Sequence, residues 1–141
     1  EPMILISRDF LPFLLDRISG IDGHYTAFRL AFFFGTDPRS TITPPNSNVL
    51  AQFDFPSPWA TPWDGNSVHK SGPITTTVTA SGIASYWRLA GFNNGAWSTV
   101  VHGSIGLVGS TADIKVRTLE WMLGDPLTLE VIRIFPIKLT Y

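Results

Sequence analysis

The first apolar pattern in the chain has the spacing of a helix. Five hydrophobic residues recur along one helical face: Phe10, Leu11, Leu14, Leu15 and Ile18. Asp9 stands just before them as an N-cap residue, Pro12 falls in the first turn, where its missing N–H does no harm, and Gly20 follows as a stop. We therefore predict a short helix over residues 10–19. An extended arm that adds to a neighbouring subunit is the alternative.

From Tyr25 onward the hydrophobic pattern has a period of two. Large apolar side chains alternate through Tyr25–Phe34, which predicts a strand buried mainly on one face. Further strands are predicted at Val49–Phe55, Ile74–Ala80, Ser85–Ala90, Ser98–Ile105, Ile114–Arg117 and Leu127–Tyr141, the last broken at Pro136. The triplet Asn93–Gly95 marks a hairpin, because Asn and Gly tolerate the positive φ of tight turns. The sequence thus predicts an all-β fold, an antiparallel β-sandwich with one short N-terminal helix.

The segment between Pro56 and Gly72 fits no regular element. Prolines 56, 58 and 62 alternate here with Trp59 and Trp63. We predict an irregular, proline- and tryptophan-rich loop over residues 56–72. Because no linker, repeat or low-complexity tract interrupts the chain, residues 1–141 are predicted to form a single domain.

Composition narrows the class of function. Charged residues make up 15% of the chain and hydrophobic residues 44%, against a usual charged share of about 25%. A surface so short of charge indicates that a partner covers part of it. The net charge of −1, without a basic run, argues against nucleic-acid binding. No apolar stretch approaches the length of about 20 residues that spans a bilayer, and no signal peptide is predicted.

The residues that carry chemistry form no recognisable motif. His24, His69 and His102 lie far apart without a second metal ligand at helical or hairpin spacing. No Gly-x-Ser-x-Gly elbow surrounds any serine, and no pair of carboxylates is marked out for acid–base work. The chain has no cysteine. We therefore predict no enzymatic activity, no metal and no cofactor.

The tryptophans are the strongest candidates for binding. Trp59 and Trp63 lie four residues apart in a proline-stiffened segment that would lose little conformational entropy on a partner. The alternative is that this segment folds back over its own sandwich as a lid. Trp87 is expected in the core. For Trp121 a core position and a surface position are equally expected. The predicted protein-interface residues are Phe10, Phe13, Trp59, Trp63 and Trp97.

The order of motifs resembles a family of small virion proteins of tailed phages. In the first half the likeness rests on the predicted helix, Phe28–Phe34, Gly35–Pro38 and Leu50–Phe53. In the second half it rests on Thr79–Leu89, the Gly-rich hairpin, His102–Gly106 and Leu123–Leu127. The longer stretch from Pro56 to His69 departs from the family pattern, which affects the expected mode of attachment.

The resemblance implies a jelly-roll-type sandwich and a structural role. It implies a capsid decoration, or cement, subunit that binds the outer surface of the phage head and joins neighbouring major capsid proteins. A homo-oligomer, dimer or trimer, would present several such contacts at one site. A carbohydrate-binding module of a tail fibre or baseplate is the alternative, with Trp59, Trp63 and Trp97 lining a sugar platform. A hydrolase is the third hypothesis.

Overall fold

The computed structural model describes residues 11–36 and 49–135 of the chain. Within these residues one helix is followed by strands only, so the prediction of a mostly β protein with a short N-terminal helix is confirmed. The elements are α1 (Leu11–Ser19), β1 (Ala27–Phe33), β2 (Val49–Pro56), β3 (Thr61–Trp63), β4 (Ser67–Thr77), β5 (Gly82–Ile83), β6 (Tyr86–Asn93), β7 (Ala96–Leu107), β8 (Ile114–Val116), β9 (Glu120–Trp121) and β10 (Pro126–Ile134).

Helix α1 buries the apolar face that the sequence predicted and ends just before the predicted Gly20. Leu11, Leu15 and Ile18 are buried against the sheets. Gly20 adopts a φ of 93°, and its N–H donates to the carbonyl of Asp16 at 3.1 Å, which closes the last turn. The predicted cap Asp9 and the predicted interface residue Phe10 lie outside the described residues.

The largest sheet has the order β2-β1-β6-β7-β8. Its neighbours pair antiparallel except at one edge, where β8 runs parallel to β7 with Ile105 opposite Ile114. The prediction of a purely antiparallel fold is therefore wrong at β8. Alternation of apolar and polar residues is the same for both pairing directions, so the sequence pattern does not distinguish them. The predicted hairpin is confirmed, since Asn94 and Gly95 have φ values of 52° and 77° between β6 and β7.

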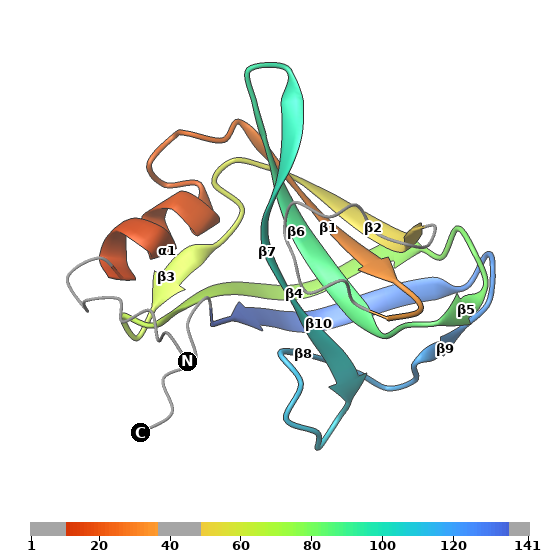
Figure 1. Cartoon of the computed structure of the whole chain (residues 1–141). Coiled ribbons are helices and arrows are strands. Elements are labelled where there is room, and N and C mark those ends of the chain that lie inside the picture. Colours follow the sequence, from red (N-terminus) through yellow and green to blue (C-terminus); the bar gives the residue numbers. More distant parts are fainter. Residues whose placement is uncertain (1–10, 37–48, 136–141) are drawn as a thin grey trace, which may run out of the picture.

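Two small antiparallel sheets complete the fold, with orders β10-β4-β3 and β5-β9. Hydrogen bonds join β2 to β4 and its continuation: the N–H of Thr79 donates to the carbonyl of Leu50 at 2.7 Å, and the Thr76 hydroxyl to the carbonyl of Gln52 at 2.9 Å. The strands therefore follow one another around a single core in the order β10-β4-β2-β1-β6-β7-β8. Figure 1 shows the curled sheet over β4 and β10, with α1 at one side and β5 and β9 at the other.

The segment 56–72, predicted as irregular, contains regular structure. Strand β3 pairs with the start of β4, and Asp64 and Gly65 make the turn between them with φ values of 55° and 69°. Strand β3 is the edge of its sheet, where Pro62 can sit without breaking a ladder. Pro62 therefore belongs to an edge strand and not to an irregular loop.

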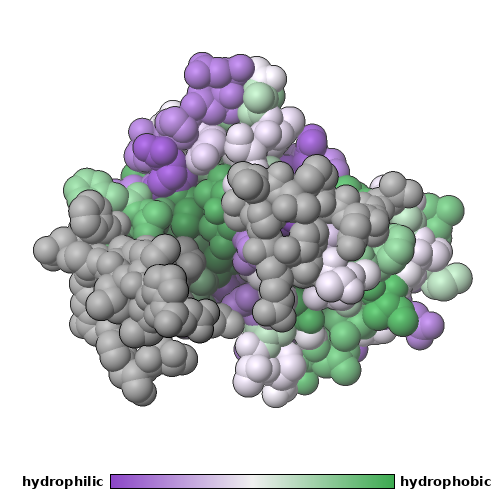
Figure 2. All heavy atoms as spheres, viewed as in Figure 1, coloured by the Kyte–Doolittle hydropathy of each residue, from purple (hydrophilic) through white to green (hydrophobic). Residues whose placement is uncertain are grey.

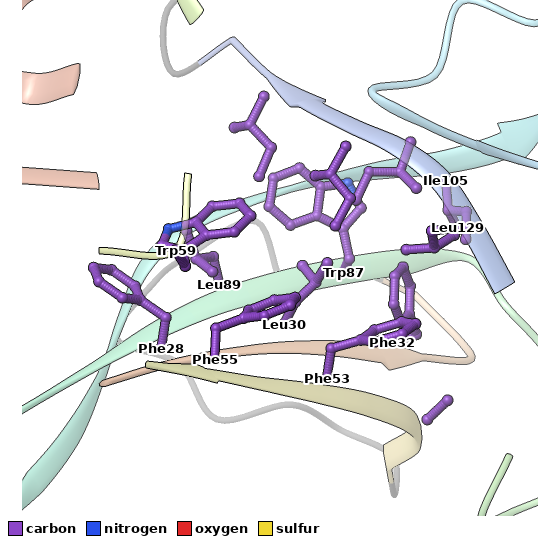
Figure 3. Packing of buried hydrophobic residues seen from close by; sticks show 14 of the residues in the cluster. Phe28, Leu30, Phe32, Phe53, Phe55, Trp59, Trp87, Leu89, Ile105 and Leu129 are labelled. Carbon is purple, nitrogen blue, oxygen red and sulfur yellow. The ribbon is translucent and has the colours of Figure 1, made fainter. Parts of the chain in front are cut away.

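The core is rich in aromatic rings. Phe28 and Phe32 from β1 and Phe53 and Phe55 from the neighbouring β2 lie on the same face of the sheet and point into the interior, where the indole of Trp87 belongs to the same cluster (Figure 3). The expectation that Trp87 belongs to the core is confirmed, with 1% of it exposed.

Candidate functional site

The structure separates the predicted interface residues. Trp59 is only 4% exposed, and its ring stacks on Phe55 with a centroid distance of 5.3 Å. Trp59 is therefore a core residue rather than an exposed anchor, which agrees with the alternative that this segment folds back over the sandwich. Phe13, Trp63 and Trp97 are exposed but come from α1, β3 and β7, and the Trp63 ring lies against His69.

Trp97 forms an aromatic platform with four neighbours on the outer face of the largest sheet. Register places Phe92 opposite Trp97 and Arg29 opposite Asp54. The Arg29 guanidinium lies over the indole at 4.3 Å from its centre, and its Nε donates to Asp54 at 2.8 Å. Gln52 donates to the second oxygen of Asp54 at 3.3 Å. An aromatic ring beside a guanidinium, a carboxylate and an amide can bind a polar, ring-bearing ligand or a protein surface.

A second surface, the end patch, consists of Phe34, Ile83, Met122 and Leu123. Each of these side chains is between 39% and 68% exposed. Large apolar side chains that gather on a surface mark interaction sites. Figure 2 shows hydrophobic surface on the side of the molecule where β5 and β9 lie.

The β5–β9 pair holds the end patch together. Ile83 pairs with Glu120, so Met122, two residues further, falls on the same face of the pair. The Leu123 N–H donates to the Ser81 hydroxyl at 2.8 Å. Phe34 packs near Gly82, where an added Cβ would lie 3.5 Å from its ring. Sequence analysis missed this patch, although adjacent Met and Leu before the Gly124-Asp125-Pro126 turn were a usable signal.

A groove of about 760 Å³ runs between β8 and β10. Val116, Trp121 and Leu127 are buried at its floor. Volumes of this size are typical of binding clefts. The groove is also lined by charged residues: Asp113, Lys115, Arg117, Asp125, Glu130 and Arg133.

Metal-ligating side chains do not gather in the described part of the chain. It holds no cluster of three or more metal-ligating side chains. His24 contacts Asn93, whereas His69 lies against Trp63 in another sheet. Ser104 and Asp113 are hydrogen bonded, but the carboxylate also accepts from the Ser104 N–H, at 3.1 Å. This contact fastens β7 to the loop before β8.

One carboxyl group has a shifted pKa. Slight burial acts to raise the pKa of Asp22, but hydrogen bonds from the Arg17 side chain and the His24 N–H, with the charge of Arg17, outweigh it and lower the pKa below 3.8. The Arg17 Nε lies 2.6 Å from the carboxylate. The contacts of Asp22 with Arg17 and with the His24 N–H order the turn after α1.

Comparisons with known proteins do not assign this chain to a family. Within the described residues no helix is long and apolar enough to span a membrane. No protein-family model, curated protein or solved structure matches the chain.

Proposed function

We propose that this chain is a non-enzymatic structural virion protein, a decoration or cement subunit on the outer surface of a phage capsid. The observation that carries the proposal is the end patch, where four large apolar side chains on and next to the β5–β9 pair are exposed. A site built to bind a protein needs such an apolar centre, whereas a catalytic site needs converging polar groups.

Two features of the sequence support the same proposal. The low charged fraction of 15% fits a surface partly covered by other proteins. The motif order resembles that of small tailed-phage virion proteins, whose implied partner is the major capsid protein. The jelly-roll-type sandwich implied by this resemblance is part of the proposal, and an experimental structure with two packed sheets and Greek-key connections would support it.

The mechanism is physical. Packaged DNA presses outward on the shell, and a subunit that bridges capsid proteins adds interface free energy that must be lost before the shell opens. Many copies, each a dimer or trimer, turn a modest affinity per contact into a large resistance.

The test measures binding of the purified chain to heads stripped of it. The variant Ile83→Ser/Leu123→Ser removes the centre of the end patch, and Ile21→Ser, at a similarly exposed position beside α1, is the matched control. We expect the double variant to lose at least about tenfold in affinity, as central apolar contacts do, and the control to bind normally. Heads that neither bind the chain nor gain heat resistance from it would overturn the proposal.

A carbohydrate-binding module of a tail fibre or baseplate is the second candidate, and the aromatic platform favours it. Trp97 is 39% exposed and Arg29 covers one face of its ring, so a sugar would stack on the remaining exposed part, with Asp54 and Gln52 able to hydrogen bond its hydroxyl groups. Buried Trp59 cannot join such a platform. A glycan-array signal that Trp97→Ala abolishes and Trp63→Ala leaves intact would support the module, and the absence of any signal would reject it.

A further inference from the structure

The groove between β8 and β10 follows β10 from Pro126 to Arg133. At the Arg133 end it comes close to β3, because the guanidinium donates a hydrogen bond to Asp64, in the turn after β3, at 2.8 Å. Opposite β10 the lining residues come from β8 and the loops on either side of it (Figure 1). The groove therefore has a β10 wall and a β8 wall above its buried apolar floor.

The charged residues of the lining fall into two halves. One half is held by contacts inside the chain: Asp113, Asp125 and Arg133. The other half consists of Lys115, Arg117 and Glu130, which are exposed and make no ion pair or side-chain hydrogen bond within the described residues. Lys115 and Arg117 lie on the β8 wall, whereas Glu130 lies on the β10 wall. The free charge of one wall is thus positive and that of the other is negative.

A β-bulge shapes the β10 wall. The register between β10 and β4 shifts between Leu129 and Val131, and Glu130 and Val131 are both exposed although they are adjacent in sequence. Bulges redirect side chains in this way and disfavour the addition of a further strand. The β10 wall therefore offers side chains to a partner, a carboxylate beside a valine that is 51% exposed.

The β8 wall carries an exposed valine as well. The Val108 N–H donates to the Val116 carbonyl at 3.1 Å, which places Val108 at the end of β8. Val108 is 72% exposed and lines the groove. Each wall thus combines free charge with one exposed apolar side chain, and the signs of the two walls are opposite.

We propose that a second copy of this chain binds the groove through its own groove, related by a two-fold axis. In such an interface residue i contacts residue j and j contacts i, so the β8 wall of each copy meets the β10 wall of the other. Lys115 and Arg117 then face Glu130 of the second copy, and Val108 faces its Val131. A partner with charge of one sign would be repelled by one of the two walls, which favours the second copy.

This inference rests on the homo-oligomer part of the proposed function and specifies a dimer and its interface. Its test uses only the purified full chain, without phage heads. A chain that binds heads as a monomer would overturn the dimer and leave the capsid role standing. A dimer that does not bind heads would have the opposite meaning.

The experiment reverses the free charge of each wall separately. Lys115→Glu/Arg117→Glu makes the free charge of both walls negative, and Glu130→Lys makes it positive on both. We expect each variant to raise the dimer dissociation constant at least about tenfold in sedimentation, because like charges then face each other. Glu120→Lys, the same change at an exposed position outside the groove, is the matched control and should leave the dissociation constant within about twofold.

Mixing the two reversed variants, made with different masses, restores the complementarity. We expect a heterodimer at least about tenfold tighter than the homodimer of either variant, since each negative wall now meets a positive one. Circular dichroism checks that both variants are folded before they are mixed. A natural chain that stays monomeric, a dimer that neither reversal weakens, or a mixture that forms no heterodimer would each overturn the proposal.

Discussion

The indole N–H of Trp59 donates a hydrogen bond to the carbonyl oxygen of Ile18 at 2.7 Å. The backbone N–H of Trp59 also donates to the carbonyl of Ser19 at 3.0 Å. Both acceptors belong to the last turn of α1, where carbonyl groups have no partner within the helix. A residue 41 positions away in sequence thus closes the end of the helix and fills the core beside it.

Replacing Trp59 should separate these two roles. Trp59→Phe keeps most of the packing but leaves the buried Ile18 carbonyl without its donor, which we expect to cost about 1–3 kcal/mol of unfolding free energy. Trp59→Ala should cost about 3–5 kcal/mol. Urea unfolding of the full chain measures both, with half-exposed Trp63→Ala as the control, expected to cost less than about 1 kcal/mol. Equal costs at the two positions would contradict the buried placement of Trp59.

Gly20 and Gly23 form a second matched pair. Both have positive φ, 93° and 77°, so alanine at either site should cost about 1–2 kcal/mol in backbone strain. At Gly20 an added Cβ would also lie 2.8 Å from the Phe28 ring, whereas nothing lies within 4 Å at Gly23. Gly20→Ala should therefore lower the unfolding midpoint clearly more than Gly23→Ala, and the reverse order would refute the close packing of the turn after α1 against Phe28.

The Arg17–Asp22 contact predicts a pH dependence. Because folding lowers the pKa of Asp22 below 3.8, the ionised form favours the folded state, so its contribution is present above that pH and is lost as the pH falls through the folded pKa. An NMR titration of the Asp22 carboxyl should give a value below 3.8, and Arg17→Ala should raise it. Arg29→Ala, which removes a different ion pair, should leave the Asp22 pKa unchanged.

Asp113 predicts a local effect at the parallel edge. Its carboxylate accepts hydrogen bonds from the Ser104 N–H and hydroxyl, at 3.1 Å and 3.3 Å. Asp113→Ala should cost about 1–3 kcal/mol, since it leaves donors without a charged acceptor. Hydrogen exchange should speed up most in β8 and the loop before it, while β1 and β2 stay protected; uniform loss of protection would argue against a local role.

The sequence by itself determined the local elements. The i, i+4, i+8 spacing of apolar residues, with companions at i+1 and i+5, predicted α1. The period-two runs predicted the main strands, and the triplet Asn93–Gly95 predicted a hairpin, because each signal depends on neighbours within a few residues. The burial of Trp87 followed from its place in an apolar strand.

Tertiary structure decided what depends on distant residues. Three features arise from contacts between remote segments: the parallel pairing of β8, the core position of Trp59, and the end patch, which joins residues of β5 and β9 and their neighbours. Periodicity shows which face of a strand is apolar but not which strand lies beside it or in which direction. For the same physical reason, the groove between β8 and β10 became visible only once the strands were arranged around the core.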